Sequence, residues 1–371
     1  MVTRLAILGA TGSIGRQALD VVAAHPDRLR VTALASARNA SALAALAKET
    51  GATAVVVQQR DGDGALADLA TRDDVDLVLM ATPGVAGLAP TVAALNAGKR
   101  VALANKEVLV AGGHLVRPLA GGAGERLRPV DSEHCGLWQC LIGERLEDVS
   151  RVVLTASGGP FRERPIGELG AVTAEEALRH PTWRMGPKVT VDSATLANKG
   201  YEVVETHWLY GIPYDRIDIV VHPESVVHAL VEFSDGSVKA QLAEPDMRLP
   251  IQYALLWDRA PSPAARLDLA KVRTLRFDGP PDLERYPCLA TVLRIARTGD
   301  VGAMVGLSAA DEVAVERFLR GEIGFGDINV YLARGAKLGA AQRAPKTPSL
   351  QQVLAVDRAV RDALAATPVL A

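Results

Sequence analysis

The first 130 residues alternate short apolar runs with longer stretches in which apolar and polar positions mix at helical spacing. Each run is about four residues long and uninterrupted, which is typical of a strand buried on both faces. The Ala-rich stretch 41–50 between two such runs has a helical pattern. The alternation predicts a parallel sheet covered by helices over residues 1–130, with strands at 5–8, 31–34, 54–57, 77–80 and 101–104.

The pattern changes between residues 131 and 257. Strand-like runs occur at 152–155, 189–191 and 217–221, and the 189–191 run precedes a helical stretch. Two further runs, 230–233 and 238–242, are separated by the sequence SDGS, in which Asp-Gly supplies the positive φ angles of a hairpin turn. We therefore expect a second α/β domain with a mixed or antiparallel sheet.

Residues 258–287 are rich in Pro, Arg and Asp and are typical of a linker that crosses the surface. The rest of the chain, 288–371, has helical patterns at 289–297, 308–319, 327–338 and 349–365, with Ser308 as the expected start of its helix. The chain is thus predicted to be an α/β protein with two α/β domains and a small C-terminal helical domain.

Composition agrees with this division and excludes some classes of protein. A chain of 371 residues is too long for one core, and 49% hydrophobic residues fit a folded protein. A formal net charge of −2 gives no electrostatic reason to expect nucleic acid or an anionic membrane as partner. Three cysteines without a C-x-x-C pair, no signal-peptide pattern and no apolar run of transmembrane length favour a reducing cytoplasm.

The first strand leads into a glycine-rich turn and then an amphipathic helix, in the sequence ILGATGSIG. Gly9 permits a tight turn, and Gly12 lets backbone N–H groups approach a pyrophosphate at the helix N-terminus. The spacing of Gly9, Gly12 and Gly15 is G-x-x-G-x-x-G, a variant of the dinucleotide fingerprint. Its place after the first strand favours a dinucleotide site over a turn without a ligand.

The end of the second strand distinguishes NADP from NAD. An NAD site usually has an acidic residue there to bind the ribose hydroxyls, but the run TALASARNAS contains none. Arg38 is available for a 2′-phosphate, beside Ser36 and Asn39. The sequence therefore favours NADP, with a solvated surface arginine as the alternative.

A third polar group follows the strand at 101–104, in the sequence LANKEVLV. Asn105, Lys106 and Glu107 lie at the carboxyl end of a strand, where open α/β sheets bind ligands. The same three residues are also common at a solvated helix start, and spacing alone leaves both interpretations open.

Three carboxylates are candidates for a metal site. Asp131 and Glu133 in PVDSEH share one side of an extended chain, and Glu202 would join them from the helix VDSATLANKGYEVVE. Hard oxygen ligands without a Cys- or His-rich cluster favour Mg²⁺ or Mn²⁺ over zinc. Solvated acidic residues in a polar turn are the alternative.

The helix that carries Glu202 also carries a cation and an amide. Asn198, Lys199 and Glu202 are three and four apart and share a face, so they can point at one ligand with an anionic end and a metal-bound end. Ser157, in TASGGPF, and Ser193 could join Asn198 and Lys199 around a phosphate. The alternative role for both serines is turn formation or helix capping.

The segment 157–188 is a candidate lid. Gly158, Gly159 and Pro160 begin it, Gly186 and Pro187 stand near its end, and HPTWRMG places His180 and Trp183 between them. Glycines at both ends can absorb the backbone rotations of a hinge. The alternative is that Trp183 is a local core residue.

Together these motifs, with HPESVVHALVEFSDGS, resemble the 1-deoxy-D-xylulose 5-phosphate reductoisomerase family from near residue 1 to beyond residue 330. The resemblance implies a Rossmann-type NADPH-binding domain, a catalytic domain with a lid, and a C-terminal helical domain. It also implies rearrangement of 1-deoxy-D-xylulose 5-phosphate and reduction by NADPH to 2-C-methyl-D-erythritol 4-phosphate, in the non-mevalonate isoprenoid pathway.

The resemblance also assigns roles to individual residues. It implies catalytic roles for Lys106, Glu133, His180 and Trp183, and metal ligation by Asp131, Glu133 and Glu202. Substrate contacts fall to Lys106, Ser132, Glu133, Ser157, His180, Ser193, Asn198, Lys199 and Glu202. Cofactor contacts fall to Thr11, Gly12, Ser13, Ile14, Ala37, Arg38, Asn39, Asn105, Glu107 and Gly186.

One residue departs from the family pattern. Ala37 stands where relatives often carry glycine, and its Cβ penalises a positive φ, which bears on the 2′-phosphate pocket. A homodimer is the assembly that the resemblance implies. The other functions considered are an NADP-dependent dehydrogenase of the semialdehyde or homoserine type, and a non-catalytic NADP sensor.

Overall fold

The computed structural model describes residues 2–62 and 64–366. Its first sheet has six parallel strands in the order β3-β2-β1-β4-β5-β6. The strands are β1 (Thr3–Leu8), β2 (Leu29–Ser36), β3 (Ala54–Val57), β4 (Leu77–Met80), β5 (Arg100–Leu103) and β6 (Leu127–Pro129). This strand order is that of dinucleotide-binding folds, in which ligands bind beyond the carboxyl ends of the strands.

Helices cover both faces of this sheet, as the uninterrupted apolar strands predicted. The side chains of β4 are fully buried, as is the end of β1 from Leu5 to Leu8. The helices are α1 (Ser13–Ala24), α2 (Ala40–Thr50), α3 (Gln58–Asp61), α4 (Ala65–Thr71), the 3-10 turn η1 (Gly84–Gly87), α5 (Leu88–Asn96) and α6 (Glu107–Ala120).

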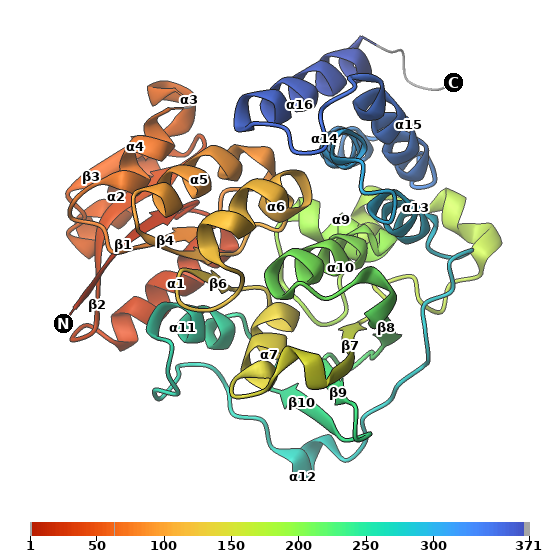
Figure 1. The fold of residues 1–371 in the computed structure, drawn as a ribbon, viewed down its shortest axis with the longest axis horizontal. Helices are drawn as coiled ribbons and strands as arrows, with labels where there is room; N and C mark the ends of the chain where they lie inside the picture. The colour runs from red at the N-terminus through yellow and green to blue at the C-terminus, as the bar shows by residue number, and fades with distance from the viewer. Residues whose placement is uncertain (1, 63, 367–371) are drawn as a thin grey trace.

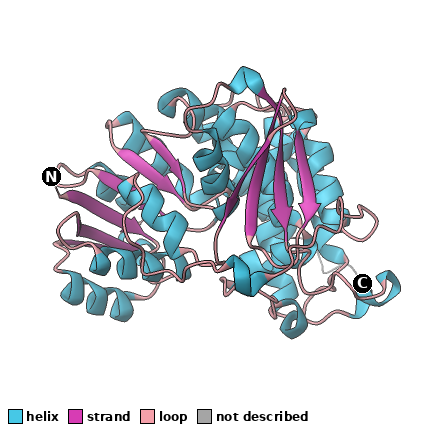
Figure 2. Ribbon diagram, turned by 90° about the horizontal axis from the view of Figure 1, so that it is seen from below, coloured by secondary structure: helices cyan, strands magenta, loops and turns pink. Residues whose placement is uncertain are grey.

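The second sheet is mixed, as predicted, with the order β10-β9-β7-β8. Strands β7 (Val149–Ala156) and β8 (Ile217–Val221) are parallel, and β9 (Val227–Phe233) is antiparallel to both β7 and β10 (Val238–Leu242). Figure 2 shows the strands gathered in two separate groups with helices between them. The remaining elements of this region are α7 (Ser132–Leu141), η2 (Leu146–Asp148), η3 (Ile166–Ala171), α8 (Ala174–Ala177), α9 (Pro187–Thr195), α10 (Ala197–Tyr210), η4 (Tyr214–Arg216) and α11 (Arg248–Leu256).

Some sequence predictions were wrong in detail. Residues 189–191 were predicted to form a strand, but they lie inside α9, where Gly186 is the N-cap and Pro187 occupies the first helical position. Strand β6 was missed because it is only three residues long. Helix α11 lies in the part assigned to the second domain, yet Ile251 and Leu255 belong to the core of the first sheet.

The C-terminal region is helical, with α13 (Pro287–Ala296), α14 (Val301–Leu319), α15 (Asp327–Ala341) and α16 (Leu350–Ala365). Helix α14 begins seven residues before Ser308, because Asp300 caps it by accepting a hydrogen bond from the N–H of Ala303 at 2.9 Å. The linker runs along the outside of the molecule from α11 through the short helix α12 (Leu269–Val272) to α13 (Figure 1).

Helices α14 and α15 touch backbone to backbone. A Cβ built on Gly339 would lie 2.1 Å from the carbonyl oxygen of Gly302, and one on Gly306 would lie 2.2 Å from that of Gly335. Only glycine allows helices to approach this closely, so these four residues fix the spacing of the pair.

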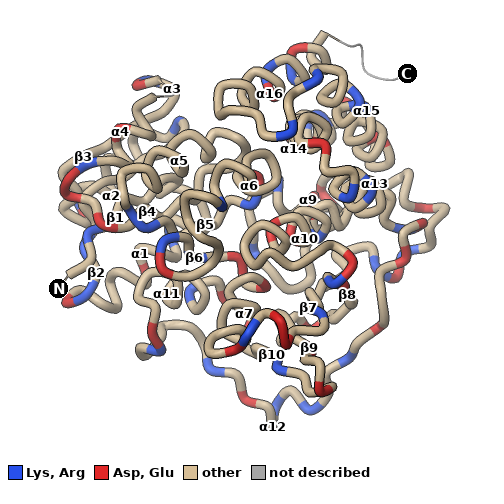
Figure 3. Tube along the Cα trace, in the orientation of Figure 1, with Lys and Arg blue, Asp and Glu red and all other residues tan. Residues whose placement is uncertain are grey.

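Charged residues of both signs are interspersed along the elements (Figure 3), in agreement with the small net charge. Among the described residues, no helix combines the length and the apolar character that crossing a membrane requires.

Candidate active site

A single cavity brings together residues from both α/β regions. It lies at the carboxyl ends of β1, β5, β6 and β7, where the strand order places a ligand site. It is lined by Ser13, Ile14, Ala104, Lys106, Asp131, Ser132, Glu133, Thr155, Ala156, Ser157, His180, Trp183, Arg184, Met185, Gly186, Val189, Ser193, Leu196, Asn198, Lys199, Glu202, Ser225, His228 and Met247. The catalytic, metal and substrate residues proposed from the sequence all line it.

The glycine-rich turn forms one side of the cavity. Gly9 has a φ of +94°, and a Cβ on it would lie 2.4 Å from the carbonyl oxygen of Ala81, so the turn requires glycine at this position. Gly12 is the N-cap of α1 and has no side chain to satisfy the first N–H groups of the helix. Those N–H groups, at Ser13 and Ile14, are therefore available to an anion beside the cavity.

Residues Ala37, Arg38 and Asn39 are exposed at the carboxyl end of β2 and do not line the cavity. Asn39 caps α2 by accepting a hydrogen bond from the N–H of Ala42 at 3.0 Å. Ala37 is not among the described residues with positive φ, so its Cβ causes no backbone strain. The departure from the family pattern is therefore accommodated by the backbone.

The side chains of Asn105 and Glu107 are buried and bonded within the protein. Asn105 donates to the carbonyl oxygen of Gly84 at 2.8 Å and accepts from the N–H of Val108 at 3.1 Å, which fixes the start of α6. Glu107 accepts a hydrogen bond from Lys188 at 2.7 Å. Of the three residues in this motif, only Lys106 reaches the cavity with its side chain.

The three carboxylates proposed as metal ligands converge. Asp131, Glu133 and Glu202 each have an oxygen within 4.8 Å of the others, although they come from the start of α7 and the middle of α10. Two ammonium groups lie among them. Lys106 is 2.6 Å from Asp131 and 3.3 Å from Glu202, and Lys199 is 2.7 Å from Glu133 and also bonded to Glu202.

The electrostatics of this group follow from its burial. Burial and the Glu133 carboxylate raise the pKa of Glu202 to about 7, more than the two lysines lower it. Burial also opposes ionisation of Asp131, but Lys106 and His134 outweigh it and hold its pKa below the usual range. The carboxylates raise the pKa of Lys106 and Lys199 against the effect of burial, so both lysines are charged.

The donor set fits a divalent cation. Three carboxylates face two ammonium groups, and the pKa of Glu202 is raised by burial first and then by the carboxylates of Glu133 and Asp131. The converging atoms are hard oxygen donors, which suit Mg²⁺ or Mn²⁺. A second group of possible donors, Asp131, His134 and Glu205, lies behind the first and shares Asp131 with it.

Lys199 and Glu202, assigned from the sequence to the anionic and the metal-bound end of one ligand, are in direct contact. Their side chains are bonded to each other, because residues three apart share a helix face within reach of an ion pair. Asn198 joins them, accepting a hydrogen bond from Lys106 at 2.6 Å. The residues proposed for the phosphate and for the metal therefore form one connected network.

The turn between α9 and α10 directs the side chains of this network toward the cavity. Leu196 has a left-handed φ of 53° and is both the C-cap of α9 and the N-cap of α10. It is buried, and a left-handed conformation is uncommon for a leucine. The sharp change of direction brings Ser193, at the end of α9, to the same cavity as Asn198 at the start of α10.

Ser157 and His180 form a hydrogen-bonded pair at the edge of the cavity. His180 Nδ1 accepts from the N–H groups of Thr182 at 3.1 Å and Trp183 at 2.9 Å, so the proton of the neutral ring is on Nε2. Nε2 then donates to Ser157 Oγ at 3.0 Å. Burial lowers the pKa of His180 to about 4, which keeps the ring neutral.

The proposed lid segment lines part of the cavity with His180 and residues 183–186. Trp183 is half-buried, with its ring centroid 6.1 Å from that of His228. Gly159 has a φ of +65°, and a Cβ on it would lie 2.8 Å from the carbonyl oxygen of Ser193. Gly186 has a φ of −65°, which any residue adopts, so a requirement for glycine is present only at the first end of the segment.

Several cavity residues were missed from the sequence. Ser225, with a φ of 53°, and His228 come from the motif HPESVVH, which was noted but given no role. Met247 reaches the cavity from the residue before α11. His134 lies behind the carboxylates, 3.5 Å from Glu205, and its Nε2 is 2.9 Å from the carbonyl oxygen of Glu202. A histidine beside the D-x-E pair was the available signal.

Comparison with known proteins relates this chain to one enzyme family. Profiles of the 1-deoxy-D-xylulose 5-phosphate reductoisomerase family match residues 5–62 and 61–113, and its C-terminal domain profiles match 127–210 and 242–363. The 1-deoxy-D-xylulose 5-phosphate reductoisomerase of Thermomicrobium roseum is 49% identical, over 96% of this chain and 95% of its own length. That of Chlorobium chlorochromatii is 48% identical, over 96% and 97%.

Solved structures of the same family are also similar to this chain. The fold resembles the crystal structure of a DOX-P reductoisomerase in complex with NADPH, fosmidomycin and magnesium, with a TM-score of 0.92, 37% identity and 98% of each chain covered. It also resembles the enzyme from Zymomonas mobilis in complex with NADPH, with a TM-score of 0.85, 39% identity and 99% of each chain covered.

Proposed function

Because this chain belongs to the 1-deoxy-D-xylulose 5-phosphate reductoisomerase family, we propose that its cavity residues carry out the family's reaction in the roles argued below. The enzyme converts 1-deoxy-D-xylulose 5-phosphate into 2-C-methyl-D-erythritol 4-phosphate, using NADPH and a divalent metal ion. A simple semialdehyde dehydrogenase and a non-catalytic NADP sensor are not favoured.

One observation carries the assignment of roles. The same cavity is bounded by the N-terminus of α1 at Ser13 and Ile14, and by the carboxylates Asp131, Glu133 and Glu202. A nicotinamide cofactor whose pyrophosphate rests on α1 would extend its reactive ring toward a substrate held by those carboxylates. An NADP sensor would have no need of three converging acids.

The phosphate of the substrate is assigned to Ser157, Ser193, Asn198 and Lys199. Ser157 Oγ accepts hydrogen bonds from His180 and from the N–H of Gly159 at 3.1 Å, so its own proton is left to donate to an anion. Lys199 supplies the charge. A dianionic phosphate would compete with Glu133 and Glu202 for that ammonium group, which is ion-paired with both.

The reacting end of the substrate is assigned to Lys106, Ser132 and the three carboxylates. A divalent ion bound by Asp131, Glu133 and Glu202 would act as a Lewis acid toward the substrate oxygens. Lys106 lies next to Asp131 and Asn198, where it can donate to an oxygen that gains charge during the rearrangement. Ser132 is bonded to Glu133 at 2.6 Å and orients that carboxylate.

The cofactor is assigned to residues at three strand ends. Thr11, Gly12, Ser13 and Ile14 hold the pyrophosphate, and Ala37, Arg38 and Asn39 the 2′-phosphate. Asn105 and Glu107 hold the start of α6 in place, and Gly186 meets the nicotinamide end. Arg38 has a side chain free to reach solvent at the end of β2, where an NAD enzyme would carry an acid.

The segment 157–188 is assigned the role of a lid. His180 and residues 183–186 already line the cavity, and Trp183 is half-buried, so a small movement would bring its ring onto a ligand. Exclusion of water would strengthen the electrostatic interactions of Lys106 and Lys199 with the substrate.

The decisive experiment is an assay of NADPH oxidation with 1-deoxy-D-xylulose 5-phosphate. We expect turnover that is lost in chelator and restored by Mg²⁺ or Mn²⁺. Turnover unaffected by chelator would contradict the metal site, and binding of NADPH without any turnover of this substrate would favour the sensor.

We further propose a homodimer in the cytoplasm. Val153 and Leu230 on the outward face of the second sheet line a groove with Ile219, Phe277 and Leu283, of which Phe277 and Leu283 are 45% and 48% exposed. An apolar groove of this kind suits a second copy of the chain. Cys135, Cys140 and Cys288 are free and buried, in keeping with a reducing compartment. Sedimentation of the wild type and of Leu230→Glu would test the dimer.

A further inference from the structure

Lys188 is the centre of a second charge cluster, outside the lining of the active-site cavity. Its ammonium nitrogen lies 2.7 Å from Glu107, 2.6 Å from Asp192 and 2.7 Å from Asp311. Lys188 donates a hydrogen bond to Glu107, and the same ammonium group is ion-paired with Asp192 and Asp311. The carboxylates are buried, with 7%, 2% and 1% of their side chains exposed.

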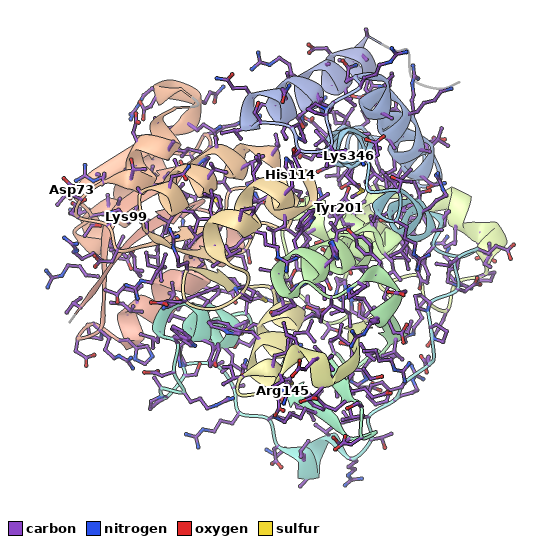
Figure 4. The ribbon with its side chains drawn as sticks, in the orientation of Figure 1. Asp73, Lys99, His114, Arg145, Tyr201 and Lys346 are labelled. Carbon is purple, nitrogen blue, oxygen red and sulfur yellow. The ribbon has the colours of Figure 1, made fainter. Side chains whose placement is uncertain are left out.

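The cluster joins four helices. Lys188 and Asp192 lie in the first turns of α9, Glu107 begins α6, and Asp311 is in the middle of α14. The nitrogen also lies 5.2 Å from the ring centroid of Tyr201 in α10, a fully buried residue that Figure 4 labels near the centre of the molecule. Lys188 thus connects the C-terminal helical region to the helices that carry the active site.

The partners of Lys188 on α6, α9 and α10 are each adjacent in the sequence to an active-site residue. Glu107 follows Lys106, and Asp192 precedes Ser193. Tyr201 lies between Lys199 and Glu202 in the sequence and directly precedes Glu202. Any shift of the ammonium group relative to these helices would therefore move the neighbouring side chains that line the cavity.

The surroundings leave no substitute for the lysine. Tyr201 Oη, Asp192 Oδ1 and both carboxylate oxygens of Asp311 have no hydrogen-bond partner within the described part of the chain. Lys188 is the cation ion-paired with both aspartates, so its loss would leave these buried carboxylates without a countercharge. Arginine carries the same charge in a planar fork, which cannot meet three carboxylates that converge on one point.

We propose that Lys188 is a positioning residue for the reaction, which locks the first turn of α6 and the lid end of α9 against α14. It touches neither substrate nor cofactor and acts through Lys106, Ser193 and Lys199. This inference rests on the proposed function, because those three residues are assigned to the substrate there. Asp311, on α14, is the anchor against which Lys188 holds α6 and α9.

The test compares four variants. Lys188→Met removes the charge and keeps the length, Lys188→Arg keeps the charge in another shape, and Asp311→Asn removes only the α14 anchor. Lys337→Met, at an exposed site on α15, is the matched control. Kinetics are measured at a temperature where circular dichroism shows each variant to be folded, and backbone hydrogen exchange is measured without ligands.

We expect Lys188→Met to lower kcat/KM for the phosphosugar by about 100-fold, mainly by raising KM, because displacement of binding groups by about 1 Å has effects of that size. Lys188→Arg and Asp311→Asn should lie between it and the wild type, and Lys337→Met should match the wild type. Amide exchange at residues 107–110 and 187–192 should accelerate in Lys188→Met and in Asp311→Asn, while that of β1 stays unchanged.

A Lys188→Met protein with lower thermal stability but wild-type kcat/KM and wild-type exchange in both stretches would overturn the proposal. If Lys188→Met does not fold, Asp311→Asn decides by the same two readouts. Failure of the proposed function is distinguishable, since the wild type would then not turn over 1-deoxy-D-xylulose 5-phosphate, while the exchange measurement would still report the lock.

Discussion

Nε2 of His180 donates a hydrogen bond to Oγ of Ser157 across 3.0 Å, although the two residues are 23 positions apart. The bond joins the residue that follows β7, where the lid segment begins, to the part of that segment that lines the cavity. The bond also fixes which atoms of His180 and Ser157 carry their protons. With Nδ1 of His180 accepting from two backbone N–H groups, the ring stays neutral and Ser157 keeps its own proton for a ligand.

This pair predicts a pH dependence of stability. The pKa of His180 is about 4 in the folded protein, below its ordinary value of 6.5. Between those values the unfolded chain binds more protons, so the contribution of His180 to stability is complete above about pH 6.5 and is lost as the pH falls toward about 4. His180→Gln should lack this dependence. Thermal unfolding of both proteins across the window measures it, and parallel curves would contradict the prediction.

Glu202→Gln tests the metal assignment. Glu202 is 1% exposed and lies between Lys106 and Lys199, so the neutral amide should preserve packing while it removes one anionic ligand. We expect normal folding, NADPH binding close to wild type and loss of most turnover, partly recovered at high Mg²⁺. Glu49→Gln, at an exposed site on α2, is the control. Near-normal turnover at ordinary metal concentration would remove Glu202 from the site.

Arg38→Ala tests the preference for NADPH. A charged hydrogen bond is worth about 1.5–3 kcal/mol, so KM for NADPH should rise roughly 10- to 150-fold, while KM for NADH stays nearly constant. Arg30→Ala, at an exposed position of β2, the strand that precedes Arg38, controls for loss of surface charge. An equal loss for both cofactors would assign Arg38 a structural role.

Trp183→Ala separates a lid from a core anchor. Trp183 is half-buried, so truncation should cost well below the about 3–5 kcal/mol typical of a buried tryptophan, while kcat/KM falls strongly. Trp138→Ala is the comparison, because Trp138 is 5% exposed and packs on Tyr253 with ring centroids 5.0 Å apart. Similar destabilisation in both variants, with unchanged proteolysis of segment 157–188 on ligand binding, would establish Trp183 as core.

Most of the fold was predictable because strong local signals agreed with the tertiary structure. Strands β4 and β8 begin and end where the apolar runs do, and the Asp-Gly hairpin forms with Gly236 at a φ of +84°. Residues 189–191 misled because Val-Thr-Val has a high strand propensity. The segment is nevertheless helical, because Pro187 starts a helix at its first position and the residues are buried against neighbouring helices.

The composition of the candidate site was predictable from the sequence, but its connectivity was not. Asp131, Glu133 and Glu202 were identified by their chemical type. The placement of Lys106 on Asp131 depends on the pairing of β5 with β6, which a single sequence does not encode locally. His228 was missed for the same reason, since its strand reaches the cavity only through the pairing of β9 with β7.

The backbone contact between α14 and α15 has a consequence for engineering. Replacement of helical glycines by alanine is a standard route to a more heat-resistant enzyme and is worth up to about 1 kcal/mol at a compatible site. At Gly302, Gly306, Gly335 and Gly339 the added methyl would push the two helices apart. Because α14 carries Asp311, such substitutions would also displace the ion-pair partner of Lys188. Variants designed for thermal tolerance would then lose catalytic efficiency at an active site far from the substitution.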